Sequence, residues 1–355
     1  MNERAKALDH KCPGCGAKIV FDPGIGKWKC DHCNGEYSLE ELQKYNNASS
    51  IENNSQVTDK ENSEYVEYHC KNCGAKIVAD EQTAATFCVY CGNTAILKNK
   101  LSGKFTTSKI IPFSKTKEEA IEAFKSLNKG RPLMPKFFNK KENIEKISGV
   151  YIPFWLFSID SNGKLDSVSE KITTWNSGNY TYTKTDIYNV QRDMNFKYDR
   201  IPVDGSTRFA DDIMNTIEPF NYDKMVDYNH AYLSGFLAER YDVEDSVASK
   251  TAESRANKST KAELMKSLAG YTTNHTKNEL ITTKLTNTEY VLLPVWMVNV
   301  KYLGKFYTFA MNAQTGEFVG NIPVDRKKAI MYGIMYFGIA ALIVIAISYL
   351  IQMGG

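Results

Sequence analysis

The residues best suited to chemistry are eight cysteines, which form four Cys-x-x-Cys pairs near the N-terminus. The first group comprises Cys12, Cys15, Cys30 and Cys33, the second comprises Cys70, Cys73, Cys88 and Cys91, and fourteen residues separate the two pairs of each group. Two residues between cysteines let one turn direct both sulfurs at one metal. Four thiolates close a tetrahedral zinc site and leave no position for water, which is typical of structural zinc. We therefore predict two structural Zn²⁺ ions.

The surroundings of the two groups are also repeated. Cys-Gly-Ala-Lys-Ile-Val begins at Cys15 and again at Cys73, an offset of 58 residues that indicates an internal duplication. Glycine directly after the second cysteine of a pair avoids steric strain where the backbone turns tightly around the sulfurs. Gly16, Gly74 and Gly92 hold this position, whereas Gly35 comes one residue later. We predict zinc ribbons at residues 10–42 (ribbon 1) and 66–98 (ribbon 2).

Two disulfides in each group are the main alternative to zinc. The regular pairing and a reducing cytoplasm, argued below, both favour zinc. His32 and His69 lie beside ligand cysteines. Because each site already has four thiolates, we interpret both histidines as surface residues.

The charge of the ribbons favours protein partners over nucleic acid. Ribbon 1 has four basic and four acidic residues between His10 and Glu40, and the whole chain has a net charge of +3. Neither value provides the basic surplus that phosphate contacts require. Residues 43–65 are rich in Asn, Ser and Glu, which predicts a flexible linker that lets the ribbons move independently.

Residues 105–324 are predicted to form a mixed α+β domain. A capping box of Thr116 and Glu119 precedes an amphipathic helix, and a strand covers residues 150–159. A turn at Ser177-Gly178-Asn179 predicts a hairpin. Further helices are expected at residues 211–217, 231–240 and 243–269; the last is polar and is interpreted as a solvated surface helix. A final strand is expected near Phe318.

A second repeat lies inside this domain. Pro153, Trp155, Gly163 and Lys164 recur 141 residues later as Pro294, Trp296, Gly304 and Lys305. This spacing predicts two related hairpins, in one sheet or in two packed halves. The Pro-x-Trp pairs suit either a binding platform or the core, and we favour the core because large aromatic residues in apolar strands usually pack there.

Residues 329–351 are predicted to cross a membrane. These twenty-three residues carry no charge, and at about 1.5 Å per residue they span a hydrocarbon layer of about 30 Å. Arg326, Lys327 and Lys328 precede the span directly. The positive-inside rule then places the N-terminal bulk in the cytoplasm of a single-pass membrane protein.

No catalytic pattern is present: the chain lacks a zinc-protease His-Glu-x-x-His, a Gly-x-Ser-x-Gly and a phosphate-binding Gly-x-x-x-x-Gly-Lys. We therefore expect no enzyme, although an active site within residues 110–324 is a third alternative. Residues 98–146 hold thirteen Lys or Arg and five Glu. This surplus is interpreted as a solvated face, with attraction to anionic lipid as the functional alternative.

The combination of features resembles bacterial zinc-ribbon membrane proteins of the YdjG type, which are also labelled TFIIB-type zinc-ribbon proteins or PriA-like. The resemblance rests on the paired ribbons, on the segments Tyr151-Ile-Pro-Phe-Trp155 and Leu293-Pro-Val-Trp296, and on the segment from Tyr232 to Tyr241. It implies a membrane anchor that works beside PspA-like membrane-stress proteins. No catalytic residue carries over, and the helicase label has no phosphate-binding loop to support it.

These observations predict a non-enzymatic membrane scaffold. Its cytoplasmic ribbons are expected to recruit protein partners in envelope stress, and its α+β domain is expected to hold a second partner or to self-associate. The alternative is a membrane-tethered nucleic-acid-binding protein that combines the ribbons with the basic surplus of residues 98–146.

Overall fold

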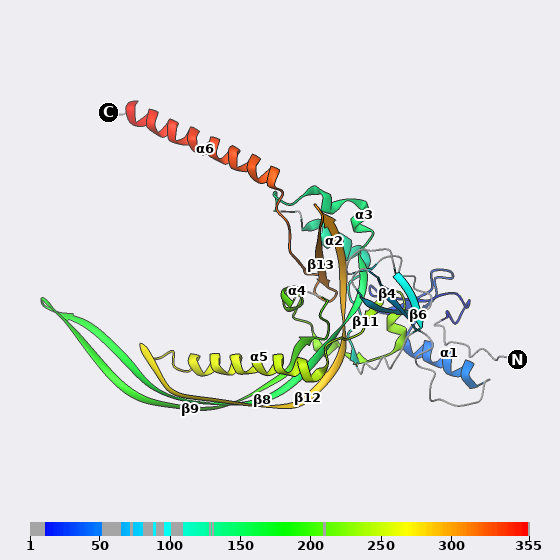
Figure 1. Cartoon of the computed structure of the whole chain (residues 1–355), viewed down its shortest axis with the longest axis horizontal. Coiled ribbons are helices and arrows are strands. Elements are labelled where there is room, and N and C mark those ends of the chain that lie inside the picture. The colour runs from blue at the N-terminus through cyan, green and yellow to red at the C-terminus, as the bar shows by residue number, and fades with distance from the viewer. Residues whose placement is uncertain are drawn as a thin grey trace.

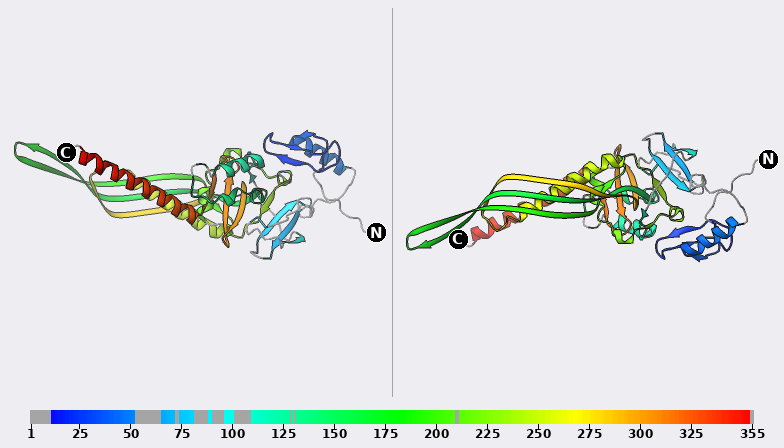
Figure 2. Two further views of the ribbon diagram at one scale, coloured as in Figure 1. Left: turned by 90° about the horizontal axis from the view of Figure 1, so that it is seen from above. Right: turned by 90° about the horizontal axis from the view of Figure 1, so that it is seen from below.

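The structure is a computed structural model that describes residues 11–51, 65–71, 74–80, 88–89, 96–100, 109–127, 129, 131–208 and 211–353. It has the predicted mixed α+β character. The cysteine-containing segments lie at one end of a central domain, and a long curved arm of strands projects from the other end (Figure 1). A C-terminal helix leaves the central domain on the same side as the arm (Figure 2).

Two sheets organise the described residues. A three-stranded sheet comprises β1 (Val20–Asp22), β2 (Lys27–Lys29) and β3 (Glu36–Tyr37). An 11-stranded sheet comprises β4 (Tyr65–Cys70), β5 (Lys76–Asp80), β6 (Ile96–Lys100), β7 (Lys109–Ile110), β8 (Ser148–Ser177), β9 (Tyr180–Asp204), β10 (Val226–Asp227), β11 (Leu237–Glu239), β12 (Thr273–Tyr302), β13 (Lys305–Asn312) and β14 (Phe318–Gly320). β8 and β12 are antiparallel neighbours at its centre.

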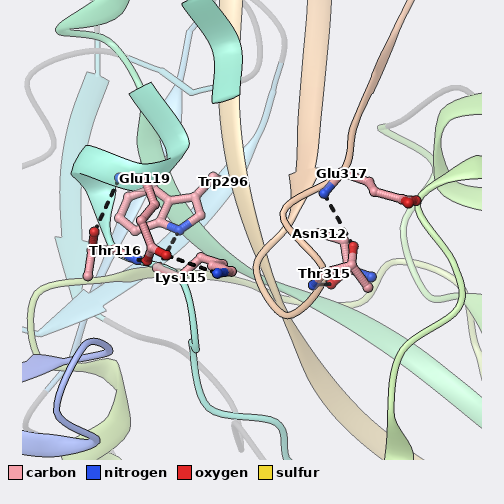
Figure 3. Close-up of polar contacts among 7 residues, drawn as sticks. All are labelled: Lys115, Thr116, Glu119, Trp296, Asn312, Thr315 and Glu317. Carbon is pink, nitrogen blue, oxygen red and sulfur yellow. Dashed lines mark hydrogen bonds and ion pairs between the residues drawn. The ribbon is translucent and has the colours of Figure 1, made fainter. Parts of the chain in front are cut away.

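The helices are α1 (Leu39–Ile51), α2 (Lys117–Ser126), α3 (Lys141–Ile144), α4 (Asp211–Thr216), α5 (Asp245–Lys266) and α6 (Arg326–Met353), with short 3₁₀ segments η1 (Lys136–Asn139), η2 (Tyr222–Lys224) and η3 (His230–Leu233). The predicted capping box of α2 is present: Thr116 Oγ1 accepts from the Glu119 N–H, and Glu119 Oε2 accepts from the Thr116 N–H (Figure 3). The predicted strand near Phe318 is β14.

The arm is the most extended part of the fold. β8, β9 and β12 continue side by side beyond Ser158, far past the predicted strand 150–159. The pairing of β8 shifts its register near Ser158 with both neighbouring strands. The shift lies between Phe157 and Ile159 in the pairing with β9, and between Leu285 and Asn287 in the pairing with β12. Bulges bend and twist a sheet, which accounts for the bend where the arm leaves the domain (Figure 1). The predicted hairpin is confirmed, because Ser177 pairs with Tyr180 and Gly178 takes a φ of 60°.

α5 is mostly exposed, as expected of a surface helix, but it packs along one face of the arm through a buried stripe. Its buried residues recur every four positions as Ala248, Ala252, Ala256, Thr260 and Leu264. Small side chains in this stripe let the helix approach the strands closely. A Cβ placed on Gly163 of β8 would lie 2.8 Å from Thr260 Cγ2, and Ser161 hydrogen-bonds to Thr260 at 2.8 Å.

The two Pro-x-Trp sequences hold equivalent places in one sheet. Trp155 Nε1 donates to the Val243 carbonyl just before the N-cap of α5 at 2.8 Å. Trp296 Nε1 donates to the Lys115 carbonyl just before the N-cap of α2, also at 2.8 Å (Figure 3). Trp296 is buried. Each tryptophan therefore holds the start of one helix. The core interpretation is confirmed for Trp296, whereas Trp155 is half-buried and packs against the core.

Three sequence predictions in this domain need correction. Gly163 and Lys164 lie in the middle of β8, whereas Gly304 lies in the β12–β13 turn, so this part of the second repeat does not mark a hairpin. Residues 231–240 are not a helix, because η3 ends at Leu233 and Gly235 has a φ of 89° before β11 begins. Finally, α1 extends into the predicted linker 43–65. This helix begins with a capping box formed by Ser38 and Glu41.

α6 contains the predicted span 329–351. It is the one helix in the described part of the chain that is long and apolar enough to cross a membrane, and none of its apolar window is buried. Its first turn is held to the domain, because the Asp325 N–H donates to the Leu133 carbonyl and Lys328 Nζ to the Met134 carbonyl.

Candidate metal centre

The four cysteines of ribbon 1 converge on one point. Their sulfurs all lie within 4.8 Å of one another, with Cys12 Sγ 3.4 Å from Cys33 Sγ and Cys15 Sγ 3.5 Å from Cys30 Sγ. Zinc–sulfur bonds of about 2.3 Å in a tetrahedron separate the sulfurs by about 3.8 Å. The donor set therefore fits a metal ion such as zinc, as the spacing predicts.

Two backbone turns of the same form place these sulfurs. In the first turn the Cys12 N–H donates to the Ala17 carbonyl and the Gly16 N–H donates to the Cys12 carbonyl. In the second turn the Cys30 N–H donates to Gly35 and the Asn34 N–H donates to Cys30.

The residue after the second cysteine is left-handed in both turns, with a φ of 71° at Gly16 and 56° at Asn34. Asparagine tolerates this conformation better than most residues. Asn34 therefore takes the position that glycine holds elsewhere, which explains why Gly35 comes one residue late.

Hydrogen bonds favour the thiolate of Cys12. Burial raises the pKa of this group, but hydrogen bonds with the Tyr37 hydroxyl and with the backbone of Cys15 and Gly14 outweigh burial and lower the pKa to about 6. In turn, the hydrogen bond with Cys12 raises the pKa of Tyr37 to about 12.

The sulfur of Cys15 behaves in the opposite way. A backbone hydrogen bond from Ala17 lowers its pKa, but burial and contacts with the other three sulfurs raise it to about 12. Sulfurs this close together cannot all be anionic unless a cation lies between them. Binding of a divalent metal supplies that charge.

Ribbon 2 shows the same turn where it is described. The Cys70 N–H donates to the Ala75 carbonyl, the Gly74 N–H donates to the Cys70 carbonyl, and Gly74 has a φ of 73°. Cys70 and Cys88 are buried. Cys73, Cys91 and Gly92 lie outside the described residues, so the second zinc site stays a prediction.

Ribbon 1 is packed on the central domain through an aromatic cluster. Trp28 Nε1 donates to the Ala231 carbonyl at 2.8 Å, and the rings of Phe21 and Tyr232 lie 4.9 and 5.0 Å from the Trp28 ring. A Cβ on Gly235 would lie 2.4 Å from Val20 Cγ1. The left-handed glycine thus allows β1 to lie directly against the segment 231–235.

Ribbon 2 joins the central sheet itself. β5 pairs antiparallel with β11, which pairs on its other side with β8. The buried carboxylate of Glu67 in β4 accepts from Arg240 Nη1 at 3.1 Å and also contacts His69. Asn299 of β12 donates to the Val89 carbonyl. These contacts tie ribbon 2 to the end of the segment that holds ribbon 1.

The structure places both ribbons against the central domain, whereas the predicted flexible linker and independent movement of the ribbons stay predictions. Both ribbons are held by one stretch of chain, residues 231–240, which we call the docking segment. Sequence reasoning missed this role because the partners are far apart in the chain: 203 residues separate Trp28 from Ala231, and 173 separate Glu67 from Arg240. The only available signal was the large share of apolar residues in the docking segment.

Arg240→Met is expected to destabilise the attachment of ribbon 2, because the buried Glu67 carboxylate then loses its arginine partner and keeps only its contact with His69. Removal of one partner of a buried ion pair costs about 3–5 kcal/mol. Urea unfolding of the full chain in detergent measures the loss. The double variant Glu67→Gln/Arg240→Met should recover part of the stability, since it buries no lone charge. Equal stability of the single variant and the wild type would contradict this role of Arg240.

Comparisons with known proteins relate the whole chain to a relative. No protein-family model matches the sequence, and no solved structure matches it. The chain is 35% identical over 349 residues to the uncharacterized protein YdjG of Bacillus subtilis (strain 168), and the alignment covers 98% of this chain and 99% of the relative. The similarity thus includes the ribbons, the central domain and the C-terminal helix, and the chain belongs to the YdjG family.

Proposed function

We propose that this protein is a non-enzymatic, membrane-anchored scaffold whose cytoplasmic ribbons recruit protein partners. The observation that carries the proposal is the attachment of both ribbons to the docking segment through buried contacts. A module held by buried aromatic and ionic contacts presents a fixed surface, which suits the assembly of partners better than capture by a flexible arm.

The outer surface of ribbon 1 is the proposed recruiting surface. Phe21 and Trp28 face the central domain and are buried. On the exposed side, Ile25 in the β1–β2 turn and Tyr45 on α1 are 44% and 40% exposed. We therefore take Ile25 and Tyr45 as the first candidates for contacts with a partner.

The membrane part of the proposal rests on α6. Its apolar, exposed surface and the basic residues Arg326, Lys327 and Lys328 at its start support a single span with the ribbons in the cytoplasm. The zinc role is structural, because four cysteine ligands leave no open position for substrate. PspA-like membrane-stress proteins, implied by the family resemblance, are the first partners to seek.

Co-purification from native cells in mild detergent tests this function. Ile25→Glu/Tyr45→Ser should lose the partners while the fold is retained, because the change lies on the exposed side of ribbon 1. Cys30→Ser should lose them through loss of the metal site. Leu280→Glu, in the middle of the distant arm, also replaces an exposed apolar residue; it serves as the matched control and should retain them.

Retention of every protein partner by both ribbon variants would contradict the proposal. Recovery of nucleic acid instead, with binding that falls steeply as salt rises, would favour the tethered nucleic-acid-binding alternative.

A further inference from the structure

The far end of the arm extends beyond every element that covers the rest of it. β12 begins at Thr273, which pairs with Glu170, so residues 171–186 form a two-stranded hairpin that we call the tip. α5 ends at Lys266. The tip is the outermost part of the arm in Figures 1 and 2.

The tip has an unusual distribution of side chains. Residues 173–183 contain no charged residue, and Lys171 and Lys184 border this stretch on the two strands. Trp175 and Tyr182 are cross-strand partners whose rings stack at 5.6 Å. Tyr180 lies two residues from Tyr182 and therefore on the same face.

These aromatic side chains are open to solvent. Trp175, Tyr180 and Tyr182 are 47%, 72% and 46% exposed. Along the middle of the arm the exposed side chains are mostly polar: Asn162 hydrogen-bonds to Asp193 and Asn195, and Lys164 pairs with Asp193. The large apolar side chain exposed there, Leu280, is aliphatic. The aromatic surface is thus concentrated at the end of the arm, where packing within the chain does not require it.

The chemistry of the tip matches the surface of a lipid bilayer. Tryptophan and tyrosine prefer the membrane–water interface, because their rings are apolar and their N–H or O–H groups reach water. Lysines beside such a surface are attracted to anionic headgroups, although Lys184 also contacts Asp186 at 3.0 Å. An uncharged end bordered by lysines can enter the headgroup layer and keep its charges outside.

The chain itself points to the membrane as the occupant. α6 holds the protein at a bilayer, and the arm and α6 leave the central domain on the same side (Figures 1 and 2). At about 3.3 Å per residue, the strand from Ser158 to Ser177 reaches about 65 Å from the bend.

We propose that the tip inserts Trp175, Tyr180 and Tyr182 into the headgroup region of a bilayer that contains anionic lipid. The insertion forms a second membrane contact, far from α6, and fixes the direction of the arm along the membrane surface. This inference rests on the proposed anchoring by α6.

Bromolipid quenching of tryptophan fluorescence tests the insertion in the full chain. α6 contains no tryptophan, and Trp28, Trp155 and Trp296 lie in the folded parts of the chain. The protein is reconstituted in phosphatidylcholine–phosphatidylglycerol vesicles with or without brominated acyl chains and excited at a wavelength selective for tryptophan. We expect a quenched component that W175F lacks.

Charge variants test the role of the lysines. Lys171→Gln/Lys184→Gln should reduce the ratio of inserted to free tip by about fivefold or more in anionic vesicles. Lys197→Gln in the middle of the arm is the matched control and should leave the ratio unchanged. Flotation of the protein with the vesicles reports α6 separately, so failure of the anchor and failure of the tip are distinguishable.

Two results would overturn the proposal. In the first, Trp175 in vesicles stays accessible to acrylamide and brominated lipid quenches wild type and W175F equally. In the second, a photo-crosslinking residue placed at Tyr180 labels a protein in cells and no lipid, which would identify the tip as a protein-docking surface.

Discussion

Removal of zinc from the Cys12, Cys15, Cys30 and Cys33 site is expected to unfold ribbon 1 and detach it from the docking segment. Small modules with four cysteine ligands depend on metal for folding, and zinc contributes about 10–16 kcal/mol to comparable peptides. Without the metal, the close sulfurs no longer hold the two turns together. Acidification acts in the same direction, because protons compete with zinc for the thiolates.

Hydrogen exchange of the full chain measures this effect. With chelator, or in Cys30→Ser, backbone amides of β1 and β2 should lose protection together with those around Ala231. His32→Ala is the matched control: His32 is an exposed neighbour of Cys33, and its loss should leave zinc content and protection unchanged. A chain purified without bound metal that still protects β1 and β2 would contradict the expectation.

Trp28→Ala is expected to destabilise the protein by about 3–5 kcal/mol, the usual cost of truncating a buried tryptophan. Trp28 is 2% exposed, contacts Phe21 and Tyr232, and donates to the Ala231 carbonyl. The change leaves a cavity between ribbon 1 and the docking segment and deprives a buried carbonyl of its donor. Ribbon 1 should then detach even with zinc bound.

Trp175→Ala provides a control of the same residue type. Trp175 is 47% exposed on the tip, and a surface change of this kind usually stays within about 0.5 kcal/mol. Urea unfolding of both variants in detergent, with zinc content measured in parallel, separates packing from metal binding. Equal stability of the two variants would show that the Trp28 contact does not hold ribbon 1.

Local patterns in the sequence predicted the parts of the fold that depend on neighbouring residues. The cysteine spacing predicted the ribbon 1 site, the Thr116–Glu119 pair predicted the start of α2, and the Gly178 turn predicted the hairpin. In each case the residues that form the feature lie close together in the chain, so type and spacing are sufficient. The uncharged run that became α6 belongs to the same class.

The parts that were missed depend on distant contacts. The docking segment was predicted as a helix, but β5 and β8 pair with its strand β11 from both sides. The buried stripe of α5 consists mostly of alanines, whose small size gives a weak amphipathic signal although it permits close packing against Gly163. A spacing of four between small residues on an otherwise polar helix was the signal available.

The position of the docking segment sets the order in which the chain can fold. Both ribbons are synthesised early, and the four cysteines of ribbon 1 are complete at Cys33, but the surface that receives the ribbons is completed only with Arg240. Phe21 and Trp28 of ribbon 1 therefore stay exposed until about two hundred further residues have been synthesised. Long-range contacts of this kind form slowly. During that interval a newly made chain presents an aromatic surface, which makes the nascent protein a natural client for chaperones. A shortened protein that lacks residues 231–240 would keep the surface exposed permanently.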